Sequence, residues 1–399
     1  MPLPPSLWLY LASRFCAATA MTMLRAAVLW HVFVLSHSPL QMGLVGLVQF
    51  SAAFLLTPLG GAVADSFDRR RVVMLAQLPP LAAGALLYIA TNRGFVSVPL
   101  IFGAMFLVAV AGAFDGPARM AFLPSLVGKE AFPRAVVFAS TTMSLAFVTG
   151  PALQGLLIAW TGMHVVYALY GGLIGLAFVF LSFLHPAGPA AAGGAMSLRA
   201  IREALGFVRR SRVVLGCMTL DMFAVIFGGA SAMLPIYADK ILGQGPKGYG
   251  ILASSLEMGS LLMGLFMLTR PPVVRAGRAL LIAVGVYGLA TVAFGLSRSF
   301  PLSVALYMIA GMGDNVSVIM RSTAIQLSTP DELRGRVSSV NMLFIQASNQ
   351  LGTAESGFVA QLTTATFSVV SGGIGCLIVL AVVAARIPEL RAYRIPLRS

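Results

Sequence analysis

The sequence predicts an all-α membrane protein with twelve transmembrane helices arranged as two six-helix bundles. Of its 399 residues, 58% are hydrophobic and 10% are charged, and the mean hydropathy is +0.90. A soluble globular domain contains fewer apolar and more charged residues. A spanning helix needs about 20 apolar residues, and runs of this length recur along the chain. These observations exclude a soluble enzyme, a nucleic-acid-binding domain and a disordered tail as descriptions of the whole chain.

Twelve apolar runs, separated by short polar loops, are long enough to form the predicted helices. In chain order they are 7–35, 40–64, 72–92, 97–120, 135–160, 164–184, 212–238, 248–269, 279–297, 300–324, 337–362 and 366–385. The first begins within the stretch MPLPPSLWLYLASRF, which lacks the basic region and the cleavage site of a signal peptide. An even number of spans places both termini on the same side of the membrane.

The basic residues lie mainly in alternate loops. The chain has 27 Lys and Arg against 13 Asp and Glu, which gives a net charge of +14. Nineteen of the 27 lie on the side of the termini, four on the opposite side and four within spans. The positive-inside rule therefore predicts cytoplasmic termini. Because these charges are dispersed among short loops and do not form a patch with aromatic residues, we expect no nucleic-acid partner.

The chain divides into two similar halves. The stretch HPAGPAAAGGA opens the one long connection, so we predict an N-terminal bundle over 1–184, a cytoplasmic linker over 185–211 and a C-terminal bundle over 212–399. An offset of 202 residues maps four glycines and a charged triplet onto residues of the same type. The triplet is Arg119, Glu130 and Arg134, which map onto Arg321, Glu332 and Arg336. Parallel six-helix repeats are typical of secondary transporters that bind substrate near the midplane between the halves.

The loop between the second and third predicted spans carries the most specific motif. Its sequence, GGAVADSFDRRRVV, matches the pattern G-x-x-x-D-x-x-x-R-[RK] at Gly61, Asp65, Arg69 and Arg70. With this motif in this loop, the chain resembles the major facilitator superfamily over essentially its whole length. The resemblance implies a fold of two six-helix bundles and transport by alternating access.

This loop and the fourth span contain the candidate residues of a conformational latch on the cytoplasmic face. The candidate latch consists of Gly61, Asp65, Arg69, Arg70, Asp115 and Arg119. Gly61 permits close helix approach, and Asp65 suits a helix N-terminus, where negative charge is favoured. The loop arginines can form ion pairs across the bundle. The alternatives are that the arginines only set topology and that Asp115 and Arg119 form a static ion pair.

The fifth span contains Gly150-Pro151 followed by Gly155, which resembles the Gly-Pro motif of the superfamily's proton-coupled exporters. Such a pair bends a transmembrane helix and lets a neighbour pack closely, so ordinary helix packing is the alternative. Four further stretches resemble the bacterial branch that includes the enterobactin exporter and macrolide efflux pumps. They are LASRF, LDMFAVIFGGASAMLPIYA, GMGDNVSVIMRSTAIQLSTPDELRGRVSSVN and ASNQLGTAESG. This likeness implies siderophore or drug export across a bacterial inner membrane.

Nine charged residues lie within predicted spans, where each charge costs about 2.5–3.5 kcal/mol and needs a partner or water. They are Arg14, Arg25, Asp115, Arg119, Asp221, Glu257, Asp314, Arg321 and Glu355. Asp221, Glu257 and Asp314 fall nearest the midplane, counted at about 1.5 Å per residue. Because a low dielectric favours the protonated carboxyl group, these three are candidates for proton coupling. The alternatives are static ion pairs, chiefly of Asp314 with Arg321, and sodium in place of protons.

Five polar residues are candidates for substrate binding: Arg14, Arg25, Glu257, Asn349 and Glu355. Arg14 and Arg25 are eleven residues apart and share one face of the first span. They can therefore clamp an anionic or hydroxyl-rich substrate or pair with the carboxylates. Asn349 and Glu355 belong to a polar stripe on the eleventh span. Arg25 stands where we expect a polar neutral residue in the exporter branch, so it is the candidate specificity feature.

The predicted function is proton-coupled efflux of a medium-sized polar or amphipathic organic compound. A lipid or lysolipid flippase is the alternative within transport, and a transporter-like sensor or a polytopic membrane enzyme is the alternative from another class. We expect no enzyme activity because motifs such as G-x-S-x-G and H-E-x-x-H are missing. The three cysteines lie in apolar spans, so we expect no metal site. We also expect no cofactor. We expect a monomer whose partners are the substrate, a proton or sodium ion, and membrane lipid.

Overall fold

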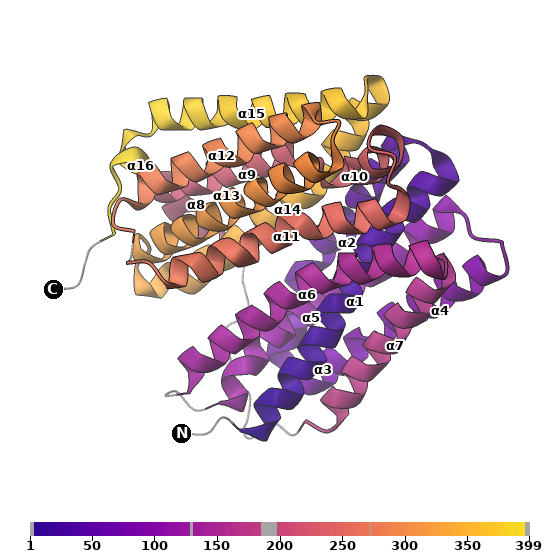
Figure 1. Cartoon of the computed structure of the whole chain (residues 1–399). Helices are drawn as coiled ribbons and strands as arrows, with labels where there is room; N and C mark the ends of the chain where they lie inside the picture. Colours follow the sequence, from indigo (N-terminus) through magenta and orange to yellow (C-terminus); the bar gives the residue numbers. More distant parts are fainter. Residues whose placement is uncertain (1–3, 128–130, 185–197, 272, 396–399) are drawn as a thin grey trace. The chain divides into compact units, whose positions relative to one another are not determined.

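The computed structural model is built from α-helices (Figure 1). It describes residues 4–127, 131–184, 198–271 and 273–395. Within these ranges no residue lies in a β-strand, and eleven helices are long and apolar enough to cross a membrane. The eleventh predicted span falls in a further helix of 32 residues, α14, whose polar stripe makes it less apolar than the others. The predicted fold class is confirmed.

The first half of the chain forms the helices α1 to α7. They are α1 (Pro5–Ser36), α2 (Pro39–Ser66), α3 (Arg69–Ala76), α4 (Leu78–Asn92), α5 (Val98–Leu126), α6 (Phe132–Trp160) and α7 (Met163–Ser182). Asp68 caps α3, because its carboxylate accepts a hydrogen bond from the backbone N–H of Arg71 at 2.9 Å. The third predicted span is broken at Gln77, just before a Pro-Pro pair that cannot supply backbone N–H groups for a continuous helix.

The second half forms the helices α8 to α16. They are α8 (Leu198–Arg210), α9 (Arg212–Gly228), α10 (Leu234–Ile236), α11 (Gly245–Leu268), α12 (Ala276–Leu296), α13 (Phe300–Leu327), α14 (Asp331–Leu362), α15 (Ala365–Arg386) and α16 (Pro388–Ala392). The predicted span 212–238 is interrupted after Gly228, where short 3₁₀ and π turns flank α10. Residues 185–197 of the predicted linker lie outside the described residues, and the rest of it contains α8, which the sequence analysis did not predict.

Contacts divide the chain into two compact units. Unit 1 comprises Met1–His37, Val48–Met196 and Gly245–Ser254, and unit 2 comprises Ser38–Leu47, Ser197–Gln244 and Ser255–Ser399. The first turns of α2 therefore belong to unit 2, and the first turns of α11 belong to unit 1. The domain boundaries given above from the sequence stay a prediction.

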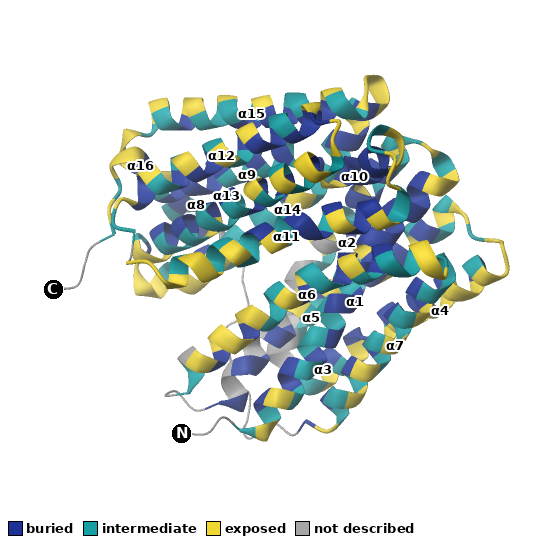
Figure 2. Ribbon diagram, viewed as in Figure 1, coloured by how far each residue is buried: buried dark blue, intermediate teal, exposed yellow. Residues whose placement is uncertain are grey.

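Each unit has its own apolar core. In unit 1, buried side chains of α1, α3, α5, α6 and α7 pack together, among them Tyr10 and Phe122. In unit 2 the core draws on α8, α9 and α12 to α16, with Cys217 and Val337 fully buried. Exposed residues recur along the helices (Figure 2). They include large apolar side chains such as Leu268, which is 81% exposed. In a chain of spanning helices, such exposed apolar surfaces are expected to face lipid.

Candidate functional site

Two of the predicted proton-coupling carboxylates lie beside a close helix crossing in unit 2. The helices α11 and α13 approach through Gly259 and Gly311, where an added Cβ atom would overlap a backbone carbonyl of the opposite helix. The hydroxyl of Ser260 donates a hydrogen bond across the crossing to the carbonyl oxygen of Gly311 (2.9 Å). Small residues permit such close approach between membrane helices. Glu257 on α11 and Asp314 on α13 each lie within three residues of this crossing.

The buried side chain of Tyr307 lies on the same face of α13 as Asp314, seven residues before it. The Tyr287 hydroxyl donates a hydrogen bond to the carbonyl oxygen of Gly228 at the end of α9 (2.8 Å). A phenol can both donate and accept hydrogen bonds, so Tyr307 can serve either protonation state of a neighbouring acid. Tyr287 and Tyr307 could not be predicted from the sequence, because no spacing distinguishes them from packing residues.

The third midplane carboxylate, Asp221, forms an ion pair with Arg321, which joins α9 to α13 within unit 2. The Arg321 side chain is 4% exposed and the Asp221 side chain 10%. Arg321 thus pairs with Asp221 and not with Asp314, the partner considered from the sequence. Spacing along one helix reveals neighbours on that helix only, whereas this partner lies on another helix.

A polar pocket of about 380 Å³ lies in unit 1. Its polar lining is Arg14, Thr22, Arg25, Gln49, Asp115 and Arg119, and its large apolar side chains are Met21, Leu24, Met105, Met143 and Phe147. Arg14 and Arg25 line the same pocket, in agreement with their shared helix face. Arg119 donates from its Nε atom to both carboxylate oxygens of Asp115, at 2.8 and 2.7 Å, which is the ion pair considered as an alternative. Arginine guanidinium groups beside methionine and phenylalanine side chains suit an apolar ligand that carries acidic or hydroxyl groups.

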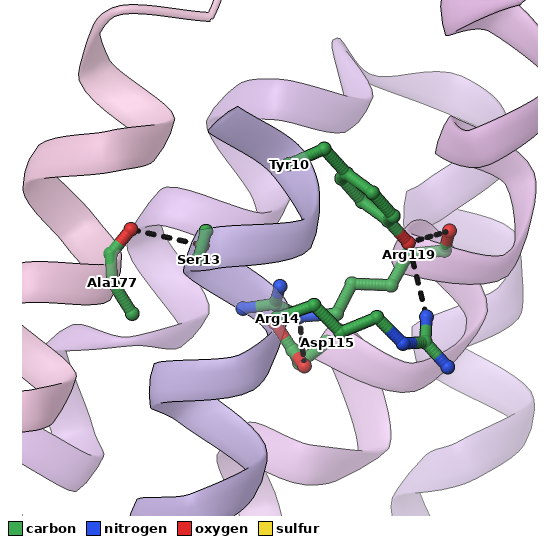
Figure 3. Close-up of polar contacts among 6 residues, drawn as sticks. All are labelled: Tyr10, Ser13, Arg14, Asp115, Arg119 and Ala177. Atoms are coloured by element: carbon green, nitrogen blue, oxygen red, sulfur yellow. Dashed lines mark hydrogen bonds and ion pairs between the residues drawn. The ribbon is translucent and has the colours of Figure 1, made fainter. Parts of the chain in front are cut away.

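Tyr10 connects two arginines of this pocket, Arg14 and Arg119 (Figure 3). Arg14 donates a hydrogen bond to the Tyr10 hydroxyl (3.0 Å), and this hydroxyl donates to the backbone carbonyl oxygen of Arg119 (3.2 Å). Next to Arg14, the hydroxyl of Ser13 donates to the carbonyl oxygen of Ala177 on α7 (2.9 Å). These bonds attach α1 to α5 and α7, and they orient the Arg14 side chain.

The candidate latch is described only in part. The side chains of Gly61, Asp65 and Arg69 lie outside the described residues. Arg70 donates hydrogen bonds to the carbonyl oxygens of Leu181 (3.1 Å) and Ser182. These carbonyls belong to the C-terminal end of α7, where a cation is favoured, so Arg70 contacts a helix end, and the latch stays a prediction. Close approach of α2 to α5 occurs at Gly60, where a Cβ atom would overlap the carbonyl oxygen of Ala113.

The remaining substrate candidates lie on α14 in unit 2. The exposed amide of Asn349 donates a hydrogen bond to the carbonyl oxygen of Ile345 in its own helix (2.8 Å). Glu355 lies beside Ser356, whose hydroxyl contacts the Glu355 carboxylate at 3.4 Å and donates to the Gly229 carbonyl oxygen at 2.9 Å. Glu355 therefore sits beside the point where α9 is interrupted, and its role in binding stays a prediction.

Gly150 and Gly155 lie where α6 packs closely against other helices of unit 1. A Cβ atom at Gly150 would overlap the Thr22 hydroxyl of α1, and one at Gly155 would lie 2.5 Å from the Cα atom of Gly250. Pro151 lies inside α6. This geometry supports the helix-packing interpretation of the motif, because both glycines lie where a neighbouring helix leaves no room for a side chain.

Replacing Gly150 with Val is expected to lower the free energy of unfolding by about 1–3 kcal/mol, as overpacking does. The cause is the overlap with Thr22 on α1. Thermal unfolding of the detergent-purified protein measures this loss. The control is Gly172→Val on α7, where no atom lies within 4 Å of the added Cβ. An equal loss in both variants would show that β-branching, and not the contact with α1, is responsible.

A family model described as transmembrane secretion effector matches residues 6–397 of the chain. The chain belongs to this family. The enterobactin exporter EntS of Escherichia coli O127:H6 (strain E2348/69 / EPEC) is 24% identical over 393 residues, which cover 96% of this chain and 92% of that protein. The EntS protein of Escherichia coli O1:K1 / APEC has the same identity and coverage.

Solved transporter structures share the fold of the secretion-effector chain. The POT family transporter PepTSo matches with a TM-score of 0.79 at 14% identity, covering 98% of this chain and 99% of that one. A variant of the nucleoside transporter NupG matches with a TM-score of 0.78 at 12% identity, covering 95% and 99%. The resemblance to the major facilitator superfamily is confirmed, and the protein is an integral membrane transporter of its exporter branch.

Proposed function

We propose that the protein is a proton-coupled exporter of a medium-sized polar or amphipathic organic compound and works by alternating access. The observation that carries proton coupling is the placement of Glu257 and Asp314 at the α11–α13 crossing, with the buried Tyr307 on the same face of α13 as Asp314. Two carboxylates at one crossing inside the membrane repel each other when both are charged, so we assign to this pair the role of holding the coupling proton. Asp221 is the counter-charge of Arg321, and we assign proton coupling to Glu257 and Asp314 because of their place at this crossing.

The pocket of unit 1 supports a substrate with acidic or hydroxyl groups. Arg14 and Arg25 line it together with methionine and phenylalanine side chains, and the relatives named above carry the name of enterobactin exporters. We therefore propose a siderophore-like or drug-like compound as substrate, with Arg25 as the specificity residue. Glu257, Asn349 and Glu355 are further binding candidates. The charge distribution supports insertion in a bacterial inner membrane with both termini cytoplasmic.

Substrate-dependent proton movement in proteoliposomes tests this proposal. Vesicles with an interior pH dye receive a catecholate siderophore, a macrolide or a lysolipid, and the native protein is compared with Asp314→Asn and Arg25→Gln. We expect one compound class to evoke proton flux, Asp314→Asn to reduce it to the level of empty vesicles, and Arg25→Gln to raise the substrate concentration needed for half-maximal flux. The control is Asp331→Asn, since the Asp331 side chain is 81% exposed.

Two outcomes would contradict the proposal. If compounds cross the membrane without protons, and sodium drives them instead, the carboxylates bind sodium and the proton coupling is wrong. If only the lysolipid moves, the protein is a flippase and the pocket arginines bind a lipid headgroup.

A further inference from the structure

The unpredicted helix α8 packs on the end of unit 2 that the charge distribution places in the cytoplasm. Its Ala204 and Val208 side chains are buried in the core of unit 2. Glu203 on α8 forms an ion pair with Arg336 near the start of α14. A buried face and an ion pair therefore attach α8 to the bundle, so it is an ordered part of this surface.

An open groove of about 880 Å³ runs along α8. Three arginines line it, Arg202, Arg209 and Arg210, together with the apolar side chains of Leu205, Phe207 and Leu333. The three arginines are exposed, and within the part of the chain that the structure describes they form no ion pair with an acidic side chain. Among the described lining residues Glu203 alone is acidic, and it is paired with Arg336.

Membrane topology alone does not explain why these three arginines line a groove. Loop arginines orient a membrane protein wherever they lie in a short loop, and no groove is needed for that. Here Arg202 and Arg209 are seven residues apart and so project from the same face of α8, beside apolar side chains. Basic clusters on amphipathic helices, next to apolar surface at the cytoplasmic side, are typical of sites for anionic lipid headgroups.

We propose that the α8 groove binds an anionic membrane lipid. Arg202, Arg209 and Arg210 hold its phosphate group by charge-assisted hydrogen bonds, and Leu205 and Phe207 contact the start of its acyl chains. This site is independent of the transport mechanism proposed above. Its occupant is a lipid and not a soluble phosphate compound, because the apolar side chains of Leu205, Phe207 and Leu333 line the groove beside the arginines.

Lipid binding to the purified full-length protein tests the proposal. Phosphatidylglycerol is titrated into the detergent-solubilised protein, and bound lipid is counted by native mass spectrometry. Each basic residue near an anionic headgroup contributes about fivefold to binding, so the triple variant Arg202→Gln/Arg209→Gln/Arg210→Gln is expected to bind about a hundredfold more weakly. The control Arg275→Gln/Arg278→Gln/Arg386→Gln removes the same charge from exposed positions of unit 2 away from the groove and is expected to bind as the native protein does.

A second variant tests the groove without changing any charge. Gly206 lines the groove, and no atom lies within 4 Å of a Cβ placed there, so Gly206→Phe fills the groove and does not disturb the helix packing. We expect it to abolish the site while thermal unfolding of the protein stays unchanged. Equal losses in the two triple variants, or native binding by Gly206→Phe, would overturn the proposal. Equal competition by phosphatidylcholine or by glycerol phosphate would also overturn it, because the site would then recognise no anionic lipid.

Discussion

Asp221→Asn is expected to lower the free energy of unfolding by about 3–5 kcal/mol, because it leaves the buried Arg321 guanidinium without its counter-charge. The expected result is a low yield from membranes and a strongly reduced unfolding temperature in detergent. The double variant Asp221→Asn/Arg321→Gln is expected to regain most of this loss, since neither buried side chain then carries a charge. Thermal unfolding of the native protein and the two variants measures both effects.

An exposed ion pair provides the control for Asp221. Asp331 pairs with Arg334 in an exposed position, so Asp331→Asn is expected to cost at most about 1 kcal/mol. If Asp221→Asn instead unfolds at the native temperature and abolishes substrate-evoked proton flux, Asp221 is a proton-coupling residue and the structural role assigned to it is wrong.

Gly311→Ala is expected to lower the free energy of unfolding by about 1–3 kcal/mol and to reduce proton flux in the protein that still folds. The added methyl group would overlap the backbone carbonyl of Leu256 on α11. A backbone atom cannot turn away as a side chain can, so α11 and α13 must separate. This separation moves Glu257 away from Asp314. Thermal unfolding and proteoliposome flux, measured on the same preparation, report the two consequences.

A glycine on α11 provides the matched control for Gly311. A Cβ atom at Gly264 would meet only the Asn315 side chain, at 3.6 Å, which is an ordinary van der Waals distance. Gly264→Ala is therefore expected to keep native stability and native flux. Native behaviour of Gly311→Ala would show that neither stability nor proton flux needs the close crossing. It would contradict a proton site shared between Glu257 and Asp314.

The spanning helices could be predicted because their signal is local. The predicted span 97–120 corresponds to α5 (Val98–Leu126), and 366–385 corresponds to α15 (Ala365–Arg386). An apolar run of about 20 residues is needed wherever a helix crosses lipid, and each run is contiguous in the chain. The helix α8 escaped prediction because it is short, amphipathic and follows a Pro/Gly/Ala stretch that indicates a linker.

Charged residues in the spans could be found from the sequence alone, because a charge in an apolar run has an evident cost and needs compensation. Their partners could not be found in this way. Arg321 pairs with Asp221 on another helix, and Arg70 contacts the carbonyl end of α7. Composition and periodicity report the environment of one segment, whereas a partner depends on which helices pack together and at what distance. The fold class and the set of costly charges were therefore readable from the chain. Only the packing of helices on one another decided which of those charges form ion pairs and which lie beside the proposed proton site.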